Sequence, residues 1–373
     1  MSAPKNRTFQ IEAFKFKHQV GVDPKYADKT WNILEHAIHE IYNHNASGTN
    51  VEELFRNAYN MVLHNFGEKL CSGLVTTITF HLKEMSSSIE AAQEGLFLEE
   101  LNSKWEDHNK ALQMIRDIFM YMDRTFIPST HKTPVHELGL NLWRDVVIHS
   151  SKIQTRLQDT LLELIQRERD GEVINRDLMR NITKMLMDLG SSVYQNDFEK
   201  QFLESSAHFY RLESQKFIQS CDCGEYLKKA ERYLNEEKER VSHYLDAKTE
   251  VKITNVVEKE LIESHMVRLV HMENSGLVNM IVDDKYEDLG RMYSLFHPVP
   301  NGFALIRDVM TSYIQQTGQQ LVAEDPEDFV ERLLDLKDKY DKIIGLAFSN
   351  DETFQNAFNS SFEYFIDLNA RSP

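Results

Sequence analysis

Apolar and polar positions follow the period of an α-helix along nearly the whole chain. After Asp23-Pro24, apolar residues recur at spacings of three and four, which predicts a helix with one buried face. These residues are Trp31, Leu34, Ile38 and Ile41. Alternation with a period of two never persists for more than a few positions, so no strand is predicted. The pattern indicates about fifteen helices joined by short loops, as in a helical bundle or a solenoid of helical repeats.

The same periodicity predicts the bounds of the later helices. They fall at residues 70–90, 97–126 (one long helix or two with a bend), 135–150, 152–169, 176–189, 193–221, 225–244, 252–271, 289–296, 302–317, 326–346 and 351–368. Residues 128–134 are expected to form a loop. Gly171 and Gly190 stand where a helix C-cap favours glycine. Pro298 and Pro300 predict a sharp turn before the helix that starts at Gly302.

The helix that follows Ser47-Gly48 carries more apolar surface than one core needs. Asn50 and Glu53 have the spacing of a capping box, which places the helix start. Its apolar residues spread over roughly 200° of arc, whereas a helix lying on one core needs about 100°. The surplus edge holds Phe55, Tyr59, Leu63 and Phe66, with Glu52 among them. Either this helix is wedged between two layers of its own protein, or one edge is kept for a partner.

Two other features also have either a purely structural explanation or a role in binding a partner. Tyr121 lies about 120° away from the centre of an apolar stripe on its helix, as a half-exposed surface ring would. Residues 1–22 show no helical stripe but include Phe9, Ile11, Phe14 and Phe16. This segment is either a frayed tail or an arm that becomes ordered on a partner.

Composition narrows the class of protein. A chain of 373 residues can hold two or three domains, and 41% hydrophobic with 27% charged residues indicates a globular chain. No apolar run reaches the ~18–20 residues that span a bilayer, and the first ten residues lack a signal peptide. Three cysteines cannot form a disulfide framework, so we expect a soluble intracellular protein. The net charge of -17 argues against duplex nucleic acid as the main ligand.

Signatures of catalysis are mostly absent. Phosphate-binding glycine loops, nucleophile elbows, HExxH and paired CxxC motifs do not occur. His36 and His39 have metal-like spacing on a helix, but zinc needs further ligands, and solvated histidines explain them as well. Cys221-Asp222-Cys223 resembles half of a metal or redox site. The alternative is that these are two ordinary thiols in a loop between helices. We therefore expect no active site, no metal and no cofactor.

Long stretches of the chain resemble the N-terminal half of the cullins, most closely the cullin-3 group in a form similar to plant sequences. The stretches are RNAYNMVLHNFGEKL (56–70), MIRDIFMYMDRTF (114–126), LLELIQRERDGEVINR (161–176), VYQNDFEKQFLESSAHFY (193–210), YLKKAERYLNEEKERVSHYLD (226–246), HMENSGLV (271–278), DLGRMYSLF (288–296) and FQNAFNSSFEYFIDLNARSP (354–373). They cover essentially the whole length.

This resemblance implies an elongated all-α arc of three cullin repeats, each a bundle of about five helices. The implied division is an arm at 1–22 and repeats at 23–150, 151–260 and 261–373. It also implies a non-catalytic scaffold of a cytoplasmic and nuclear ubiquitin ligase, whose first repeat docks a substrate adaptor with a BTB domain. The RING subunit would bind a C-terminal half, which we expect this chain to lack. Neither nucleic acid nor membrane is an implied partner, and a dimer would form only through the adaptor.

Carried over position by position, the implied adaptor contacts lie on the second and fifth helices of the first repeat and on the arm. They are Thr49, Val51, Glu52, Phe55, Tyr59, Tyr121, Phe9, Ile11 and Phe14. The cullin-3 pattern has leucine, phenylalanine and tyrosine where this chain has Thr49, Val51 and Phe55. Loss of large apolar groups from a buried contact weakens binding, by about 1–3 kcal/mol for each large truncation.

The differences from the cullin-3 pattern at Thr49, Val51 and Phe55 leave a second hypothesis open. In this hypothesis the chain is a helical tethering module or truncated paralogue with weakened adaptor binding, and it could compete for adaptors. An enzyme is a third hypothesis, which lacks support from any converging catalytic groups.

Overall fold

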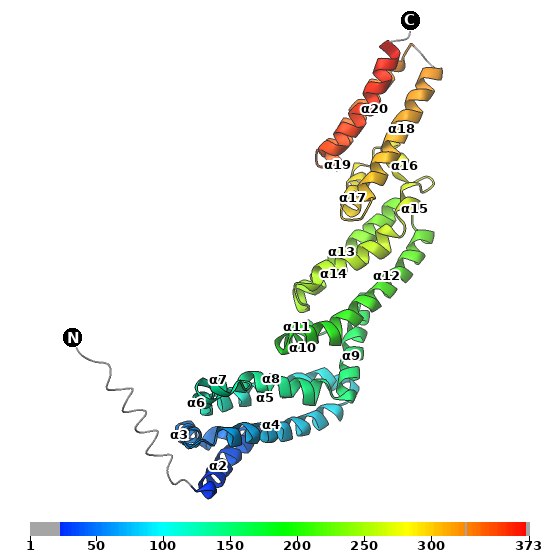
Figure 1. Cartoon of the computed structure of the whole chain (residues 1–373). Helices are drawn as coiled ribbons and strands as arrows, with labels where there is room; N and C mark the ends of the chain where they lie inside the picture. Colours follow the sequence, from blue (N-terminus) through cyan, green and yellow to red (C-terminus); the bar gives the residue numbers. More distant parts are fainter. Residues whose placement is uncertain (1–22, 325–326, 371–373) are drawn as a thin grey trace, which may run out of the picture. The chain divides into compact units, whose positions relative to one another are not determined.

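The computed structural model describes residues 23–324 and 327–370, with side chains up to residue 368 (Figure 1). All regular structure in these ranges is helical and none is a strand, which confirms the all-α prediction. The chain separates into two compact units, Met1–Phe198 and Glu199–Pro373. The division into three repeats at residues 150 and 260 stays a prediction.

The helices of the first unit follow one another with short turns between them (Figure 1). They are α2 (Pro24–Tyr42), α3 (Val51–Leu63), α4 (Gly67–Glu90), α5 (Phe97–Ile118), α6 (Met120–Arg124), α7 (Phe126–Thr130), α8 (Val135–Trp143), α9 (Ser151–Arg169), α10 (Arg176–Leu189) and α11 (Ser191–Tyr194). Two 3-10 turns precede α3 and α5, namely η1 (Ala46–Gly48) and η2 (Glu94–Leu96). Two π-helical segments follow α8 and α11, namely η3 (Arg144–Ile148) and η4 (Gln195–Glu199).

The first helix forms where its cap and its stripe predict it. The Asp23 carboxylate accepts the backbone N–H of Lys25 at 3.0 Å, and Pro24 is the first helical residue, where its missing N–H has no cost. The predicted stripe of Trp31, Leu34, Ile38 and Ile41 is buried. Through this face α2 packs against α3, α4 and α5.

Of the two possibilities predicted for 97–126, separate helices with a bend are confirmed and one continuous helix is wrong. Phe119 (φ -98°, ψ 17°) separates α5 from α6, and Thr125 (φ -122°, ψ -64°) separates α6 from α7. The loop predicted over 128–134 is wrong at its start, because α7 continues to Thr130. Pro128 lies within the first turn of α7, where a backbone N–H would have no partner inside the helix, so the ring does not break it.

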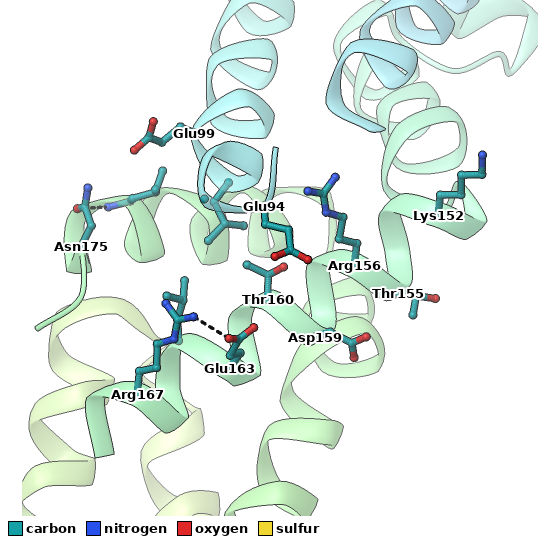
Figure 2. A pocket seen from close by; sticks show the side chains of 14 residues that line it. Glu94, Glu99, Lys152, Thr155, Arg156, Asp159, Thr160, Glu163, Arg167 and Asn175 are labelled. Atoms are coloured by element: carbon teal, nitrogen blue, oxygen red, sulfur yellow. Dashed lines mark hydrogen bonds and ion pairs between the residues drawn. The ribbon is translucent and has the colours of Figure 1, made fainter. Parts of the chain in front are cut away.

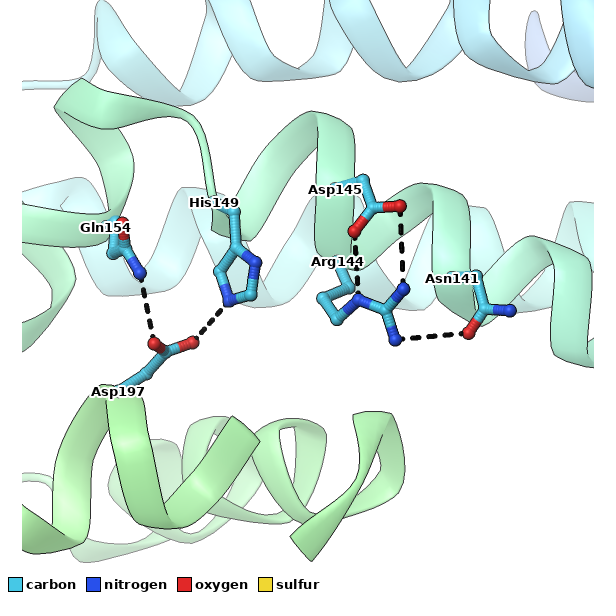
Figure 3. Close-up of polar contacts among 6 residues, drawn as sticks. All are labelled: Asn141, Arg144, Asp145, His149, Gln154 and Asp197. Atoms are coloured by element: carbon cyan, nitrogen blue, oxygen red, sulfur yellow. Dashed lines mark hydrogen bonds and ion pairs between the residues drawn. The ribbon is translucent and has the colours of Figure 1, made fainter. Parts of the chain in front are cut away.

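Polar side chains tie η3 and α9 to the end of the first unit (Figure 3). The Asp197 carboxylate accepts a hydrogen bond from Gln154 Nε2 at 3.0 Å and lies 2.7 Å from His149 Nε2. The Gln158 side chain donates to the backbone carbonyl of Asp197 at 3.3 Å. Together these contacts fix η4 on the surface of α9.

The second unit is also built of consecutive helices (Figure 1). They are α12 (Lys200–Ser220), α13 (Cys223–Tyr244), α14 (Thr249–Glu258), α15 (Met266–Val270), α16 (Leu277–Val282), α17 (Tyr286–Phe296), α18 (Gly302–Glu324), α19 (Phe329–Ala347) and α20 (Glu352–Ala370), with the π-helical segment η5 (Lys259–Glu263) after α14. The predicted turn at Pro298 and Pro300 is confirmed. The continuous helix predicted over 252–271 is wrong, because a turn at Ser264 and His265 divides it.

A buried polar network lies inside the aromatic core of the second unit. The carboxylate of Glu237 is fully buried and accepts hydrogen bonds from the Tyr210 hydroxyl and the Arg240 guanidinium. Arg240 also donates through Nε to the Tyr244 hydroxyl at 3.0 Å. A buried charge is tolerated only when it is paired and hydrogen-bonded, as this one is.

Candidate partner-binding site

Helix α3 starts and ends with local structure that its own sequence provides. The Asn50 side chain accepts the backbone N–H of Glu53 at 3.2 Å, so the predicted cap is confirmed. At the other end Asn65 has a left-handed conformation (φ 66°). The N–H of Phe66 donates to Met61 O at 2.8 Å and that of Asn65 to Val62 O at 3.1 Å. This is a Schellman motif, with asparagine in the position that glycine usually takes.

The wide apolar arc of α3 is divided into two faces. Leu54, Ala58 and Met61 are buried against the first unit. The surplus edge (Phe55, Tyr59, Leu63 and Phe66) is only half-buried. The helix therefore rests on one core, and its second apolar edge stays in part accessible to solvent.

The structure brings residues of the surplus edge together with Tyr121. Tyr121 lies on α6, which packs against α3. The ring centroids of Tyr59 and Tyr121 are 4.4 Å apart at an interplanar angle of 57°, and those of Phe55 and Tyr59 are 6.4 Å apart at 19°. Aromatic pairs at these separations attract each other beyond simple area burial. Phe55, Tyr59 and Tyr121 thus form a continuous aromatic row across two helices.

The other predicted contacts lie at the start of α3 or fall outside the described residues. Thr49 and Val51 are half-buried at the start of α3. The Glu52 side chain is 77% exposed, and its carboxylate pairs with Arg56 at 2.7 Å one helical turn later. The predicted arm residues Phe9, Ile11 and Phe14 lie outside the described residues.

Met120 is a candidate contact that the sequence analysis missed. It is the first residue of α6, directly before Tyr121, and it is 37% exposed. An exposed methionine suits a binding surface because its flexible, polarizable side chain adapts to a partner. The signal was present in the sequence, since Met120, like Tyr121, lies off the apolar stripe that includes Phe119 and Met122.

The metal and redox candidates do not assemble into sites. Within 23–324 and 327–370 no group of three or more His, Cys, Asp or Glu side chains could hold a metal ion. His39 contacts His81, with 2.7 Å between Nδ1 and Nε2. Cys221 accepts a hydrogen bond from Lys229 at 3.3 Å, while burial, with the nearby Asp288 and Asp222 carboxylates, raises the pKa of Cys223 to about 12. A thiol with so high a pKa is a poor nucleophile.

A cavity of the first unit shows no arrangement of the side chains named below for catalysis. It measures about 690 Å³ and lies between η2, the start of α5, α9 and the start of α10 (Figure 2). The Arg167 guanidinium pairs with Glu163 at 2.8 Å, and Asn175 caps α10 through Leu178 N at 3.1 Å. The Arg156 guanidinium donates to Ala92 O at 2.8 Å. Arg156, Arg167 and Asn175 are thus engaged in structural contacts.

No described helix combines the length and hydropathy that crossing a membrane requires.

Comparison with known proteins identifies the family. Residues 31–373 match the model of the cullin alpha solenoid domain. The chain is 69% identical over 378 residues to both Cullin-3B and Cullin-3A of Arabidopsis thaliana, and 45% identical over 381 residues to Cullin-3 of Dictyostelium discoideum. These alignments cover 100% of this chain and 51%, 51% and 49% of the relatives, so it spans about half their length. The chain belongs to the cullin family, and its fold is the cullin α-solenoid.

Proposed function

We propose that this chain is the adaptor-docking part of a non-catalytic scaffold in a cullin-3-type RING ubiquitin ligase. Its first unit would dock a BTB-domain substrate adaptor through α3 and α6. The observation that carries this proposal is the half-buried aromatic row of Phe55, Tyr59 and Tyr121, which joins the two helices. The similarity to curated proteins named Cullin-3 supports the same class of partner.

The chemistry of the surface suits a protein partner. Binding energy at interfaces concentrates in a few aromatic anchors that a polar rim shields from water. Tyr59 and Tyr121 would be the anchors, because each combines a large apolar ring with a hydroxyl that can bond to the partner. The exposed Glu52–Arg56 pair would belong to the rim, where either charge can turn to an adaptor group.

The remaining ligase functions would belong to other segments. A RING subunit would bind the part of the relatives' length that this chain does not span. We place the assembly in the cytoplasm and nucleus, with neither nucleic acid nor membrane as a partner. Any dimer would form through the adaptor.

A second candidate function follows from the start of α3. Thr49 and Val51 are half-buried at the start of α3 and are smaller than the leucine and phenylalanine of the cullin-3 pattern. With these groups missing, docking would be weak or selective for particular adaptors. The chain would then serve as a helical tether or compete for adaptors with other cullin scaffolds.

Calorimetric titration with a BTB-domain adaptor that includes the helices after its BTB core tests the proposal. The unaltered chain should bind, and Tyr59→Ala or Tyr121→Ala should weaken binding by about 30-fold or more, as hot-spot truncations do. Tyr364→Ala is the matched control, because this tyrosine is 61% exposed in the second unit and should leave affinity unchanged.

The double variant Thr49→Leu with Val51→Phe separates the two candidate functions. Binding only by this variant would establish the tether and overturn adaptor docking by the natural chain. Binding by neither protein would show that α3 and α6 do not form the docking surface.

A further inference from the structure

Helix α6 depends on its neighbours for its position. It consists of Met120–Arg124 and is separated from α5 at Phe119 and from α7 at Thr125. A helix this short is not stable alone, because nucleation is costly and few hydrogen bonds follow it. The place of Tyr121 beside Tyr59 is therefore set by the contacts that hold α6 and α7 on the bundle.

Two of these contacts link α6 to α4 and to the start of α8. The Met122 side chain is buried, with its sulfur 3.8 Å from the Cys71 sulfur on α4. The Asp123 carboxylate accepts the backbone N–H of Val135 at 3.0 Å, at the start of α8. Both contacts are made on the side of α6 that faces the bundle.

That side of α6 borders a groove that opens to solvent. The groove has a volume of about 300 Å³ and lies between α4, α6, α7 and α8, and its lining includes Cys71, Met122, Ile127 and Val135. Side chains that line an open groove have fewer packing partners than side chains in a filled core, so they restrain α6 less. The remaining contacts of α6 therefore have a larger share in fixing its position.

The ring of Phe126 packs over Gly67. Phe126 begins α7, and Gly67 begins α4 directly after the Schellman turn that ends α3. A Cβ atom added to Gly67 would come within 2.6 Å of Cδ2 in the Phe126 ring, a separation at which something must shift. The ring thus packs directly on the backbone where the docking helix turns into α4.

We propose that Gly67 is a positioning residue for the partner-binding surface, acting through Phe126 on α7 and α6 to hold Tyr121 against Tyr59. A side chain at position 67 would push the ring away, and α6 would move with α7 because one residue joins them. Gly67 itself would touch no partner. The inference rests on the proposed function for its effect on docking, but the effect on α6 is independent of any partner.

The test substitutes Gly67→Ala and measures two quantities. The first is hydrogen–deuterium exchange of the peptide that spans α6 and α7 in the full chain without partner. Exchange there should increase in Gly67→Ala. The matched control is Gly318→Ala, because this glycine lies under a phenylalanine ring in the second unit, with 2.7 Å from the added Cβ to Phe365 Cε2. It should leave exchange of α6 and α7 unchanged.

The second quantity is adaptor affinity. Gly67→Ala should bind about tenfold more weakly, since overpacking of this size displaces neighbouring groups. Adding Phe126→Leu should restore affinity to within about threefold. Tyr121→Ala should cost less affinity in the Gly67→Ala background than in the natural chain, because the two changes remove the same contact.

The outcomes separate this inference from the proposed function. Unchanged exchange of α6 and α7 in Gly67→Ala would overturn the positioning role, whether or not an adaptor binds. So would unaltered affinity, or additive losses in the pair with Tyr121→Ala. Increased exchange in a chain whose natural form binds no adaptor would support the positioning of α6 and reject only the docking function.

Discussion

The Nδ1 atom of His39 and the Nε2 atom of His81 lie 2.7 Å apart, so one imidazole must donate a hydrogen bond to the other. This pair is one end of a ladder of rings through the first unit. Tyr42 stacks on His81 with ring centroids 4.5 Å apart, and its hydroxyl lies 3.1 Å from His108 Nδ1. The Nε2 atom of His108 lies 3.0 Å from the carbonyl of Gly139, and it therefore donates there. The ladder joins α2, α4, α5 and α8.

The first unit should lose stability as the pH falls. Burial lowers the pKa of His81 to about 4, with the neighbouring His39 adding to the effect, and burial lowers the pKa of His108 to about 4. An unfolded histidine has a pKa near 6.5, so the unfolded chain binds more protons between pH 6.5 and pH 4. The stabilisation is complete above about pH 6.5 and decreases through this window, by on the order of 3 kcal/mol for His108.

Tryptophan fluorescence during urea denaturation measures this effect selectively, because Trp31, Trp105 and Trp143 all lie in the first unit. The free energy of unfolding should be lower at about pH 4.5 than at about pH 7.5, and His108→Gln should reduce that difference. Equal unfolding free energies at both values of pH would contradict the prediction.

Removal of the α3 cap should destabilise the first unit. Asn50→Ala leaves the N–H of Glu53 without its side-chain acceptor, which should cost about 1 kcal/mol of unfolding free energy. Asn50→Ser is the control, because a serine hydroxyl can accept the same bond. The same fluorescence measurement reports both variants, and equal losses in the two would show that the cap is not the cause.

Glycine at position 65 should stabilise the turn between α3 and α4. Asn65 is exposed and has φ 66°, a conformation that glycine adopts with less strain than any other residue. Asn65→Gly should raise the unfolding free energy by about 0.5 kcal/mol, and Asn65→Val should lower it by more than about 1 kcal/mol. The reverse order in denaturation midpoints would be evidence against the Schellman geometry.

In the second unit, Arg240→Met should be strongly destabilising. It removes a guanidinium partner from the fully buried Glu237 carboxylate, a change that typically costs about 3–5 kcal/mol. Circular dichroism should show a lower melting temperature, while the tryptophan signal of the first unit stays unchanged. The double variant Glu237→Leu with Arg240→Met should recover much of the loss. A single variant that melts like the natural chain would refute the role of the pair.

The sequence predicted most helices well because a single apolar stripe determines where a helix is stable. Trp31, Leu34 and Ile38 recur at helical spacing and are buried, and the cap at Asn50 and the stop at Gly171, which has φ 94°, follow from local chemistry. The short α16 was missed, because its six residues are too few to show a period.

The candidate site was only partly predictable. The surplus arc identified Phe55 and Tyr59, and the off-stripe position identified Tyr121, but periodicity within one helix cannot show which helices meet. The 4.4 Å contact of Tyr59 with Tyr121 depends on the break at Phe119, which re-aims the residues that follow it. The sequence allowed for a bend within 97–126, but it did not place the bend at Phe119, because the residues on both sides still favour a helix.

The π-helical segment η5 makes the chain sensitive to changes in length. Glu260, Leu261 and Ile262 follow one another and are all buried, whereas three successive residues of an ordinary α-helix point in directions spread over about 200°. The wider turn lets all three reach the interior. An in-frame loss of a single codon within 259–263 would tighten this turn and rotate the buried side chains outward. A genetic variant that removes one residue there would therefore damage the fold more than many amino-acid substitutions on the same helix.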